Sequence, residues 1–342
     1  MRLGPTLARG IAACLLAGAV AVIALAGCGS SSPAAGQSMR DATLMLDFTP
    51  NAVHAGIYSA IGRHYARKLG LRLHVVAPTA SSDPIKLLET GRIDFAILDI
   101  HDLAIARRRG QDAVGIMAIV QRPLSSVIGA PAVASPRALE GKTVGVTGVP
   151  SDTAVLRSVV AGSGGDPAKV RTITIGFNAV ADLLAGRVAG ATAFWNDEGQ
   201  AIQSKRPGFH IFRVDDYGAP SYPELVLCAT RHTIQRNRGL AQNMVDALVY
   251  GYDFTLVHPS RSAKDLEQRV PGLDPKLVSA QLNALLPAFA GPNRRVGQLD
   301  PARLRAWARW EARFGIVPRP PDVARAFDPR FAASVPTPAP AS

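Results

Sequence analysis

The hydrophobic pattern of this chain alternates short apolar runs, typical of buried strands, with segments whose apolar residues recur at helical spacing. For the first part of the chain the pattern predicts these elements: strand 43–48, helix 51–69, strand 71–76, helix 85–90, strand 94–99, helix 101–109 and strand 114–121. Strands that alternate with helices favour a largely parallel sheet covered by helices. The predicted fold class is therefore α/β.

A second lobe is predicted to open near residue 130. Its expected elements are strand 142–145, a helix from residue 150, strand 170–175, helix 178–184, strand 190–195 and strand 210–214. From about Leu225 the chain is expected to return to the first lobe and to form helices 238–257, 275–286 and 301–314. The predicted division is lobe 1 at 41–129 and 225–330, lobe 2 at 130–224, and a disordered Pro/Ala tail at 331–342. Two crossings between α/β lobes make a hinged clamp, the architecture of a solute-binding protein.

The first 27 residues are not expected to belong to this fold. Arg2 and Arg9 give a basic start, an apolar run follows at 11–26, and the run ends in Leu25-Ala26-Gly27-Cys28. Small residues directly before a cysteine are typical of a lipoprotein signal, so we expect cleavage before Cys28 and its lipidation. An uncleaved anchor and a conventional signal are the alternatives. The lipobox predicts a linker at 28–40 and a protein tethered to the extracytoplasmic face of the cell membrane.

Charge and cysteine content narrow the function classes. The formal net charge of +12 falls to +10 without Arg2 and Arg9. A basic chain could bind nucleic acid, but export argues against this, and scattered arginines favour solvated basic faces near anionic lipid. Only Cys228 remains after Cys14 leaves with the signal and Cys28 is lipidated, so no intrachain disulfide is available. No zinc-binding spacing, Walker loop or GxGxxG motif occurs, and we predict no metal and no cofactor.

The stretch 46–58 joins a strand end, a turn and a helix N-terminus. In an open α/β sheet ligands bind outside the strand C-termini, and a helix N-terminus offers unpaired N–H groups there. Asn51, His54 and Tyr58 are the polar candidates for ligand contact in this stretch. Asn51 can equally be a helix cap, and a lone helical histidine is often a packed residue.

Seven stretches carry a resemblance to a known family. They are Asp47-Phe48-Thr49-Pro50-Asn51 with His54 and Tyr58, then 91–96, 121–126, 139–145, 148–152, 194–199 and Tyr222-Pro223-Glu224-Leu225-Val226. Over residues 43–318 the chain resembles the ThiY-like binding proteins for thiamine pyrimidine precursors, which are related to sulfonate and nitrate binding proteins. The resemblance implies a type II periplasmic-binding-protein fold and a monomer that serves an ABC transporter permease and its ATPase. Phe48 stands where this family often has Trp.

The residues at the predicted cleft are mainly acidic. They are Asp47, Asp99, Asp102, Asp152, Asp197, Glu198 and Glu224, with Arg122 as the one basic exception. A sulfonate or nitrate site should offer hydrogen-bond donors and positive charge, whereas an amine-bearing ring needs carboxylate acceptors. Stacking faces are expected from Phe48, Tyr58, Trp195 and Tyr222. The sequence thus favours an aminopyrimidine, although each acid alone can equally be a cap or a surface charge.

The resemblance and this chemistry together give one set of predicted ligand contacts. The set is Asp47, Phe48, Asn51, His54, Tyr58, Asp99, Ser125, Ser151, Asp152, Trp195, Asn196, Tyr222 and Glu224. One alternative is a binding protein for a sulfonate, nitrate, taurine or another amine-bearing heterocycle. A more remote one is an enzyme, because fungal relatives synthesise the pyrimidine and His54 stands at the position of their functional histidine. The chain lacks their cysteine-rich segment and carries an export signal, so the enzyme is not the prediction.

Overall fold

The computed structural model describes residues 39–80, 82–291 and 293–335 of the 342-residue chain. The predicted signal peptide, the lipidation of Cys28 and residues 336–342 of the predicted tail lie outside the described residues. Within the described ranges, no helix combines the length and the apolar character that a membrane span requires.

The first sheet has five strands, and four of them come from the first part of the chain. Their order is β2 (Leu71–Val76), β1 (Arg40–Met45), β3 (Phe95–Asp99), β10 (Leu225–Thr230) and β4 (Ala113–Ala118). β1 pairs in parallel with β2 and β3, whereas β10 is antiparallel to both β3 and β4. The sheet is therefore mixed. β10, which begins at Leu225, lies in the middle of this sheet and runs opposite to its two neighbours.

The second sheet also has five strands. Their order is β7 (Arg171–Thr174), β6 (Thr143–Val146), β8 (Gly190–Phe194), β5 (Ser125–Gly129) and β9 (His210–Arg213). β5 is antiparallel to β8 and β9, so this sheet is mixed as well. β5 was not predicted as a separate strand, and it belongs to the second sheet. The second lobe thus begins at Ser125, ahead of the expected boundary at residue 130.

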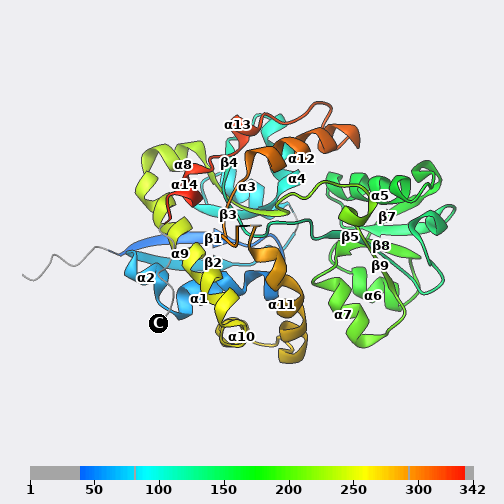
Figure 1. The fold of residues 1–342 in the computed structure, drawn as a ribbon, viewed down its shortest axis with the longest axis horizontal. Coiled ribbons are helices and arrows are strands. Elements are labelled where there is room, and N and C mark those ends of the chain that lie inside the picture. Colours follow the sequence, from blue (N-terminus) through cyan, green and yellow to red (C-terminus); the bar gives the residue numbers. More distant parts are fainter. Residues whose placement is uncertain (1–38, 81, 292, 336–342) are drawn as a thin grey trace, which may run out of the picture. The chain divides into compact units, whose positions relative to one another are not determined.

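Helices flank both sheets (Figure 1). In the first lobe they are α1 (Ala55–Gly62), α2 (Tyr65–Lys68), α3 (Asp83–Glu89), α4 (Ile100–Arg108), α8 (Arg231–Arg236), α9 (Arg238–Val257), α10 (Pro259–Glu267), α11 (Pro275–Phe289), α12 (Pro301–Arg313), α13 (Val323–Ala326) and α14 (Arg330–Ala333). In the second lobe they are α5 (Pro150–Gly162), α6 (Ala179–Leu184) and α7 (Glu198–Lys205). Short 3-10 turns are η1 (Ala52–His54), η2 (Pro136–Leu139), η3 (Pro167–Lys169) and η4 (Val214–Tyr217).

Two predicted segments differ in detail from the structure. The single helix expected at 51–69 is divided into η1, α1 and α2, and His64 between the last two has a left-handed φ of 61°. The predicted tail from residue 331 overlaps α14, in which Phe331 is fully buried against the core. The folded chain therefore extends beyond residue 330.

The position of η1 is held by the close packing of α1 on α9. A Cβ atom on Gly251 would lie 2.0 Å from the carbonyl oxygen of Gly56, so the two helices approach at a point that only glycine allows. The Tyr252 hydroxyl also donates to the carbonyl oxygen of Val53 at 2.8 Å. These contacts fix the turn that follows β1.

The chain crosses between the two sheets at residues 119–124 and again ahead of β10. The crossings lie side by side, because the backbone N–H of Ile119 donates to the carbonyl oxygen of Leu225 at 2.8 Å. Glu224 is the last residue of the second crossing. Its carboxylate oxygen Oε2 accepts hydrogen bonds from the backbone N–H groups of Leu124 and Ser125 at 2.6 and 2.8 Å. A buried carboxylate thus joins the two crossings.

Candidate functional site

A cavity lined by many polar side chains lies where strands of both sheets end. The cavity contains about 790 Å³ of space that no atom fills, part of it open to solvent. Its walls come from the loop after β1, the end of β3, the starts of α4, β5, α5 and α7, the loops after β6 and β7, and the end of β8. This is the location that α/β topology predicts for a ligand site, outside strand ends and at helix N-termini.

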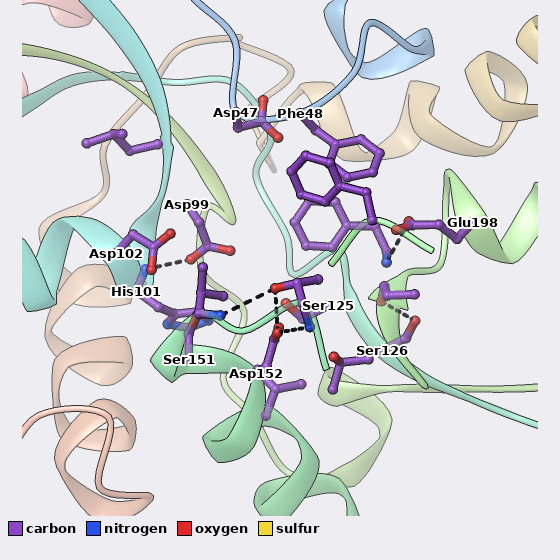
Figure 2. A pocket seen from close by; sticks show the side chains of 18 of the residues that line it. Asp47, Phe48, Asp99, His101, Asp102, Ser125, Ser126, Ser151, Asp152 and Glu198 are labelled. Atoms are coloured by element: carbon purple, nitrogen blue, oxygen red, sulfur yellow. Dashed lines mark hydrogen bonds between the residues drawn. The ribbon is translucent and has the colours of Figure 1, made fainter. Parts of the chain in front are cut away.

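Six of the thirteen predicted contacts line this cavity. They are Asp47, Phe48, Asp99, Ser125, Ser151 and Asp152. Two further acids that the sequence placed at the cleft, Asp102 and Glu198, line it as well. Figure 2 shows Asp99 and Asp102 on one side of the cavity, Glu198 on the opposite side, and Asp47 and Phe48 at a third.

The charge of the wall is one-sided. Its twenty lining residues include five carboxyl groups, those of Asp47, Asp99, Asp102, Asp152 and Glu198, and no Lys or Arg. The basic exception expected from the sequence, Arg122, pairs instead with Asp215 at 2.6 Å. Since no arginine or lysine balances these carboxyl groups in the wall, the cavity favours hydrogen-bond donors and positive charge.

Burial perturbs the titration of these acids. It raises the pKa of Asp102 to about 7, with a further upward contribution from the charge of Asp152. It raises the pKa of Glu198 to about 8, with Asp197 adding to the shift. Burial also raises the pKa of Asp99 well above its usual range, although the charge of His101 opposes the shift. Glu198 therefore keeps its proton at neutral pH, and a cationic or amine-donating ligand would favour the ionised form of these acids.

The aromatic part of the wall differs from the prediction. Phe48 lines the cavity and meets Phe177 edge to face, with ring centroids 4.4 Å apart. Phe194 is the third ring. Neither Phe177 nor Phe194 was predicted, yet both follow or end a strand of the second sheet, a position that could have identified them.

Three predicted aromatic contacts lie in the interior instead. Tyr58 of α1 is buried in the core of the first lobe. Trp195 is buried as well, and its indole N–H donates to the carbonyl oxygen of Pro123 at 2.9 Å. Tyr222 is fully buried, and its hydroxyl lies 3.1 Å from Nε2 of His101. None of the three is part of the cavity wall.

Asn51 and His54 lie behind the wall and position one of its acids. Asn51 caps η1, because its Oδ1 accepts from the N–H of Val53 at 2.9 Å. His54 is fully buried; its Nδ1 accepts from the N–H of Asn51 at 3.2 Å, so its Nε2 carries the proton that it donates to Asp47 Oδ1 at 2.9 Å. His54 therefore orients the Asp47 carboxylate and does not itself reach the cavity wall.

A buried ion-pair network supports the side of the cavity that contains Asp99 and His101. His101, also in the wall, places Nε2 3.3 Å from Glu224 Oε1 and bonds Glu311 through Nδ1. Burial disfavours the charged imidazole, but the carboxylates of Glu311 and Asp99 outweigh it and raise the pKa of His101 well above its ordinary value. Glu224 is fully buried, accepts from Ser125 Oγ at 2.9 Å and does not line the cavity.

The same network contains a group whose atoms could surround a metal ion. Asp99, His101 and Glu224 each present one ligand-type atom, and these atoms lie within 4.8 Å of one another. Each already has a protein partner: Asp99 accepts from the N–H of His101 at 2.7 Å, and Glu224 holds the start of β5. The hydrogen bonds account for the arrangement without an ion.

The remaining predicted contacts occupy the second lobe. Ser151 lies in the first turn of α5, and the helix cap is Val149, so Asp152 does not cap this helix. Asp152 instead accepts from the N–H and the hydroxyl of Thr147, each at 2.6 Å. Asn196 is almost fully buried outside the cavity wall, and neither atom of its amide group has a hydrogen-bond partner among the described residues.

Comparison with solved structures agrees with the fold. The alkanesulfonate-binding protein SsuA from Xanthomonas axonopodis pv. citri, solved bound to MOPS, superposes with a TM-score of 0.69 at 17% identity over 85% of this chain and 99% of that one. The predicted two-lobe periplasmic-binding-protein fold is thereby confirmed. At this identity the likeness concerns the fold alone.

Comparison with curated sequences finds relatives of higher sequence identity. The formylaminopyrimidine-binding protein of Halalkalibacterium halodurans is 29% identical over 289 residues, which cover 82% of this chain and 87% of the relative. A 4-amino-5-hydroxymethyl-2-methylpyrimidine phosphate synthase of Saccharomyces cerevisiae is 28% identical over only 110 residues, 31% of this chain and 32% of the yeast protein. The family model described as NMT1/THI5 like matches residues 51–262. The chain belongs to the NMT1/THI5 like family.

Proposed function

We propose that this protein is the solute-binding component of an ABC importer and that its ligand is an aminopyrimidine of the thiamine-precursor class. The observation that carries the proposal is the composition of the cavity wall, which has five carboxyl groups, no Lys or Arg, and three phenylalanine rings. The formylaminopyrimidine named for the relative from H. halodurans belongs to this chemical class.

The wall chemistry matches the functional groups of such a ring. An exocyclic amine donates two hydrogen bonds, and a protonated ring nitrogen donates a third that is charge-assisted. Asp99 and Asp102 stand together on one side of the cavity as acceptors (Figure 2). Phe48 and Phe177 offer flat apolar faces for the ring from the loops after β1 and β7.

A sulfonate or nitrate is the main alternative, and the charge of the wall argues against it. An anion would enter a cavity whose nearest ionisable groups are carboxyls, where like charges disfavour binding. His101 is the one basic side chain in the wall, and its two ring nitrogens already face Glu311 and Glu224.

Calorimetric titration tests the ligand class directly. We expect 4-amino-5-hydroxymethyl-2-methylpyrimidine and its formylamino analogue to bind, and an alkanesulfonate and nitrate not to bind. Asp99→Asn should weaken aminopyrimidine binding about tenfold or more, because it removes one charge-assisted bond while asparagine still caps α4. Asp216→Asn, an exposed acid of η4 outside the wall, is the matched control. Tighter binding of the sulfonate, or equal affinity in both variants, would refute the ligand assignment.

An enzyme of the pyrimidine-synthase type is the second alternative. Its histidine would have to act on substrate, whereas His54 is turned toward Asp47 and is fully buried. The expected result is that ligand is recovered unchanged after incubation. Formation of a pyrimidine from histidine and a vitamin B6 phosphate would overturn the binding-protein assignment.

The proposed location follows from the lipobox at Cys28. The mature protein is expected at the extracytoplasmic face of the cell membrane, held by a lipid on Cys28, where it delivers ligand to the permease. Cys28→Ala should leave the chain unprocessed or released from the membrane fraction. An unmodified Cys28 in the native protein, found by mass spectrometry, contradicts the anchor and leaves the ligand proposal intact.

A further inference from the structure

Two adjoining surface hollows on the first lobe are lined by arginines. The first hollow contains Arg107, Arg108, Arg109 and Arg319. The second contains Arg238, Arg305, Arg309 and Arg330, and both share Arg231 and Arg325. We call these ten residues the arginine face. The elements that carry most of them, α4, α8, α12 and α13, lie near one another in Figure 1.

The arginine face has a large excess of positive charge. The two hollows contain ten arginines and three aspartates, with no Lys, Glu or His, a formal excess of seven positive charges. Asp112 pairs with Arg107 at 3.5 Å and with Arg231 at 3.6 Å, and Asp328 pairs with Arg330 at 2.7 Å. The other seven arginines have no carboxylate within 4.0 Å among the residues that the structure describes. Their charge is therefore available to a partner.

The use of arginine indicates which chemical groups the partner would present. Eight of the ten arginines are exposed, and none of the ten lines the ligand cavity. A guanidinium group is planar and matches phosphate oxygens with two parallel hydrogen bonds, which lysine does not do. Arginine is the only basic residue type in the two neighbouring hollows, which contain about 1580 and 1750 Å³ of space that is partly open to solvent. Such a surface suits several phosphate groups presented together.

The point at which the chain enters the fold indicates which phosphate groups can reach the arginine face. Arg40, the first residue of β1, donates from its guanidinium to Oδ1 of Asn237 at 2.8 Å. Asn237 caps α9 and directly precedes Arg238 of the arginine face. The entry point of the chain thus lies beside one edge of the arginine face.

The tether that would precede this entry point is short. Met39 lies eleven positions after Cys28 in the sequence, and such a segment spans at most about 40 Å when fully extended. A lipid on Cys28 therefore holds this end of the fold within a short distance of the bilayer surface.

We propose that the arginine face rests on the anionic phospholipid headgroups of the membrane to which the protein is tethered. The inference relies on the lipid anchor of the proposed function and not on the ligand. A single lipid-modified residue gives a flexible attachment, and a cluster of arginines adds an electrostatic contact that orients the protein. Each arginine near an anionic surface is expected to raise the membrane partition coefficient roughly fivefold.

Vesicle sedimentation of a chain without its lipid isolates this contact. The mature chain from residue 29, secreted with a conventional signal, is mixed with phosphatidylcholine vesicles that contain or lack phosphatidylglycerol. We expect sedimentation with the anionic vesicles only, decreasing as salt is added. The double variant Arg305→Gln/Arg309→Gln on α12 should lower the partition coefficient on the order of tenfold or more.

The matched control removes the same charge from the second lobe. Arg171 and Arg206 are exposed there and lie outside the arginine face, and Arg171→Gln/Arg206→Gln should leave vesicle binding nearly unchanged. Equal loss in both double variants would show that only net charge matters and would overturn the proposal. Retained vesicle binding by Arg305→Gln/Arg309→Gln, together with reduced solute uptake in cells, would assign the surface to a protein partner and overturn it too. Ligand affinity, measured in the same samples, separates either failure from a failure of the proposed function.

Discussion

Replacing Glu224 with glutamine is the sharpest test of how the two lobes are joined. The Glu224 side chain is fully buried, and its Oε2 accepts hydrogen bonds from the N–H groups of Leu124 and Ser125. Its Oε1 accepts from the Ser125 hydroxyl and lies 3.3 Å from Nε2 of His101. Glu224→Gln keeps the size of the side chain and removes its charge.

The loss can be estimated from these contacts. Hydrogen bonds to a charged group contribute roughly 1.5 to 3 kcal/mol, and breaking one partner of a buried ion pair costs roughly 3 to 5 kcal/mol. The glutamine oxygen can keep both backbone bonds, but its NH₂ group must then face the ring N–H of His101. We expect the free energy of unfolding to fall by about 2 to 4 kcal/mol. At roughly 2 to 4 °C per kcal/mol this lowers Tm by about 4 to 16 °C.

Denaturant unfolding measures this change, with the midpoint shifting at constant m-value. Glu267→Gln on α10 is the matched control, because Glu267 is partly exposed and outside both crossings. A loss below about 0.5 kcal/mol for Glu224→Gln would refute the reasoning. If ligand affinity fell while stability stayed constant, the carboxylate would serve the ligand and not the crossings, as the sequence predicted.

Three further predictions follow from the cavity wall and the core. Phe177→Ala should weaken aminopyrimidine binding about tenfold without loss of fold, because the substitution removes the ring that meets Phe48. Calorimetry measures the change, and unchanged affinity would exclude Phe177 from the site. Burial, and then the charge of Asp197, raises the pKa of Glu198 from 4.5 to about 8. The folded protein therefore keeps a proton that the unfolded chain releases, and stability falls as pH rises from about 4.5 to 8. Glu198→Gln should therefore gain on the order of 1 to 3 kcal/mol over the wild type at pH 8 and little at pH 4, and parallel stability profiles would contradict the assignment. Gly251→Ala should destabilise the first lobe by roughly 1 to 3 kcal/mol in denaturant unfolding, because its Cβ meets the backbone of Gly56; a neutral effect would mean that α1 and α9 separate easily.

The elements were predicted best where local signals are sharp. Strand 71–76 and helix 238–257 match β2 and α9 to the residue, because Gly70 with a φ of 74° precedes the strand and Asn237 caps the helix. Strand direction has no such signal. An apolar run gives burial but not the neighbour or its direction, so the antiparallel placement of β5 and β10 could not be derived from periodicity.

The sequence predicted only part of the candidate site, again because local patterns do not reveal tertiary neighbours. Residues that directly follow a strand, such as Asp47 and Phe48, line the cavity because topology brings strand ends together. Trp195 and Tyr222 also lie beside strands, but their large side chains turn into the core. The side to which a residue in an irregular segment points depends on tertiary packing, which the sequence pattern does not contain.

The polar residues near the cavity fall into two groups that the structure separates by their partners. His54 and Glu224 are fully buried and fully bonded, and each holds a residue of the wall: His54 holds Asp47, and Glu224 holds Ser125. Asp102 and Glu198 have no Arg or Lys in the cavity wall to balance them, and burial raises the pKa of both. Glu198 Oε2 accepts from the N–H of Phe194 at 3.0 Å, yet burial still disfavours the ionised form of both acids, so packing alone gives little reason for their presence. A ligand that donates hydrogen bonds or carries positive charge does explain the presence of these two acids. A contact residue is therefore distinguished here from a positioning residue by whether protein groups already satisfy its charge.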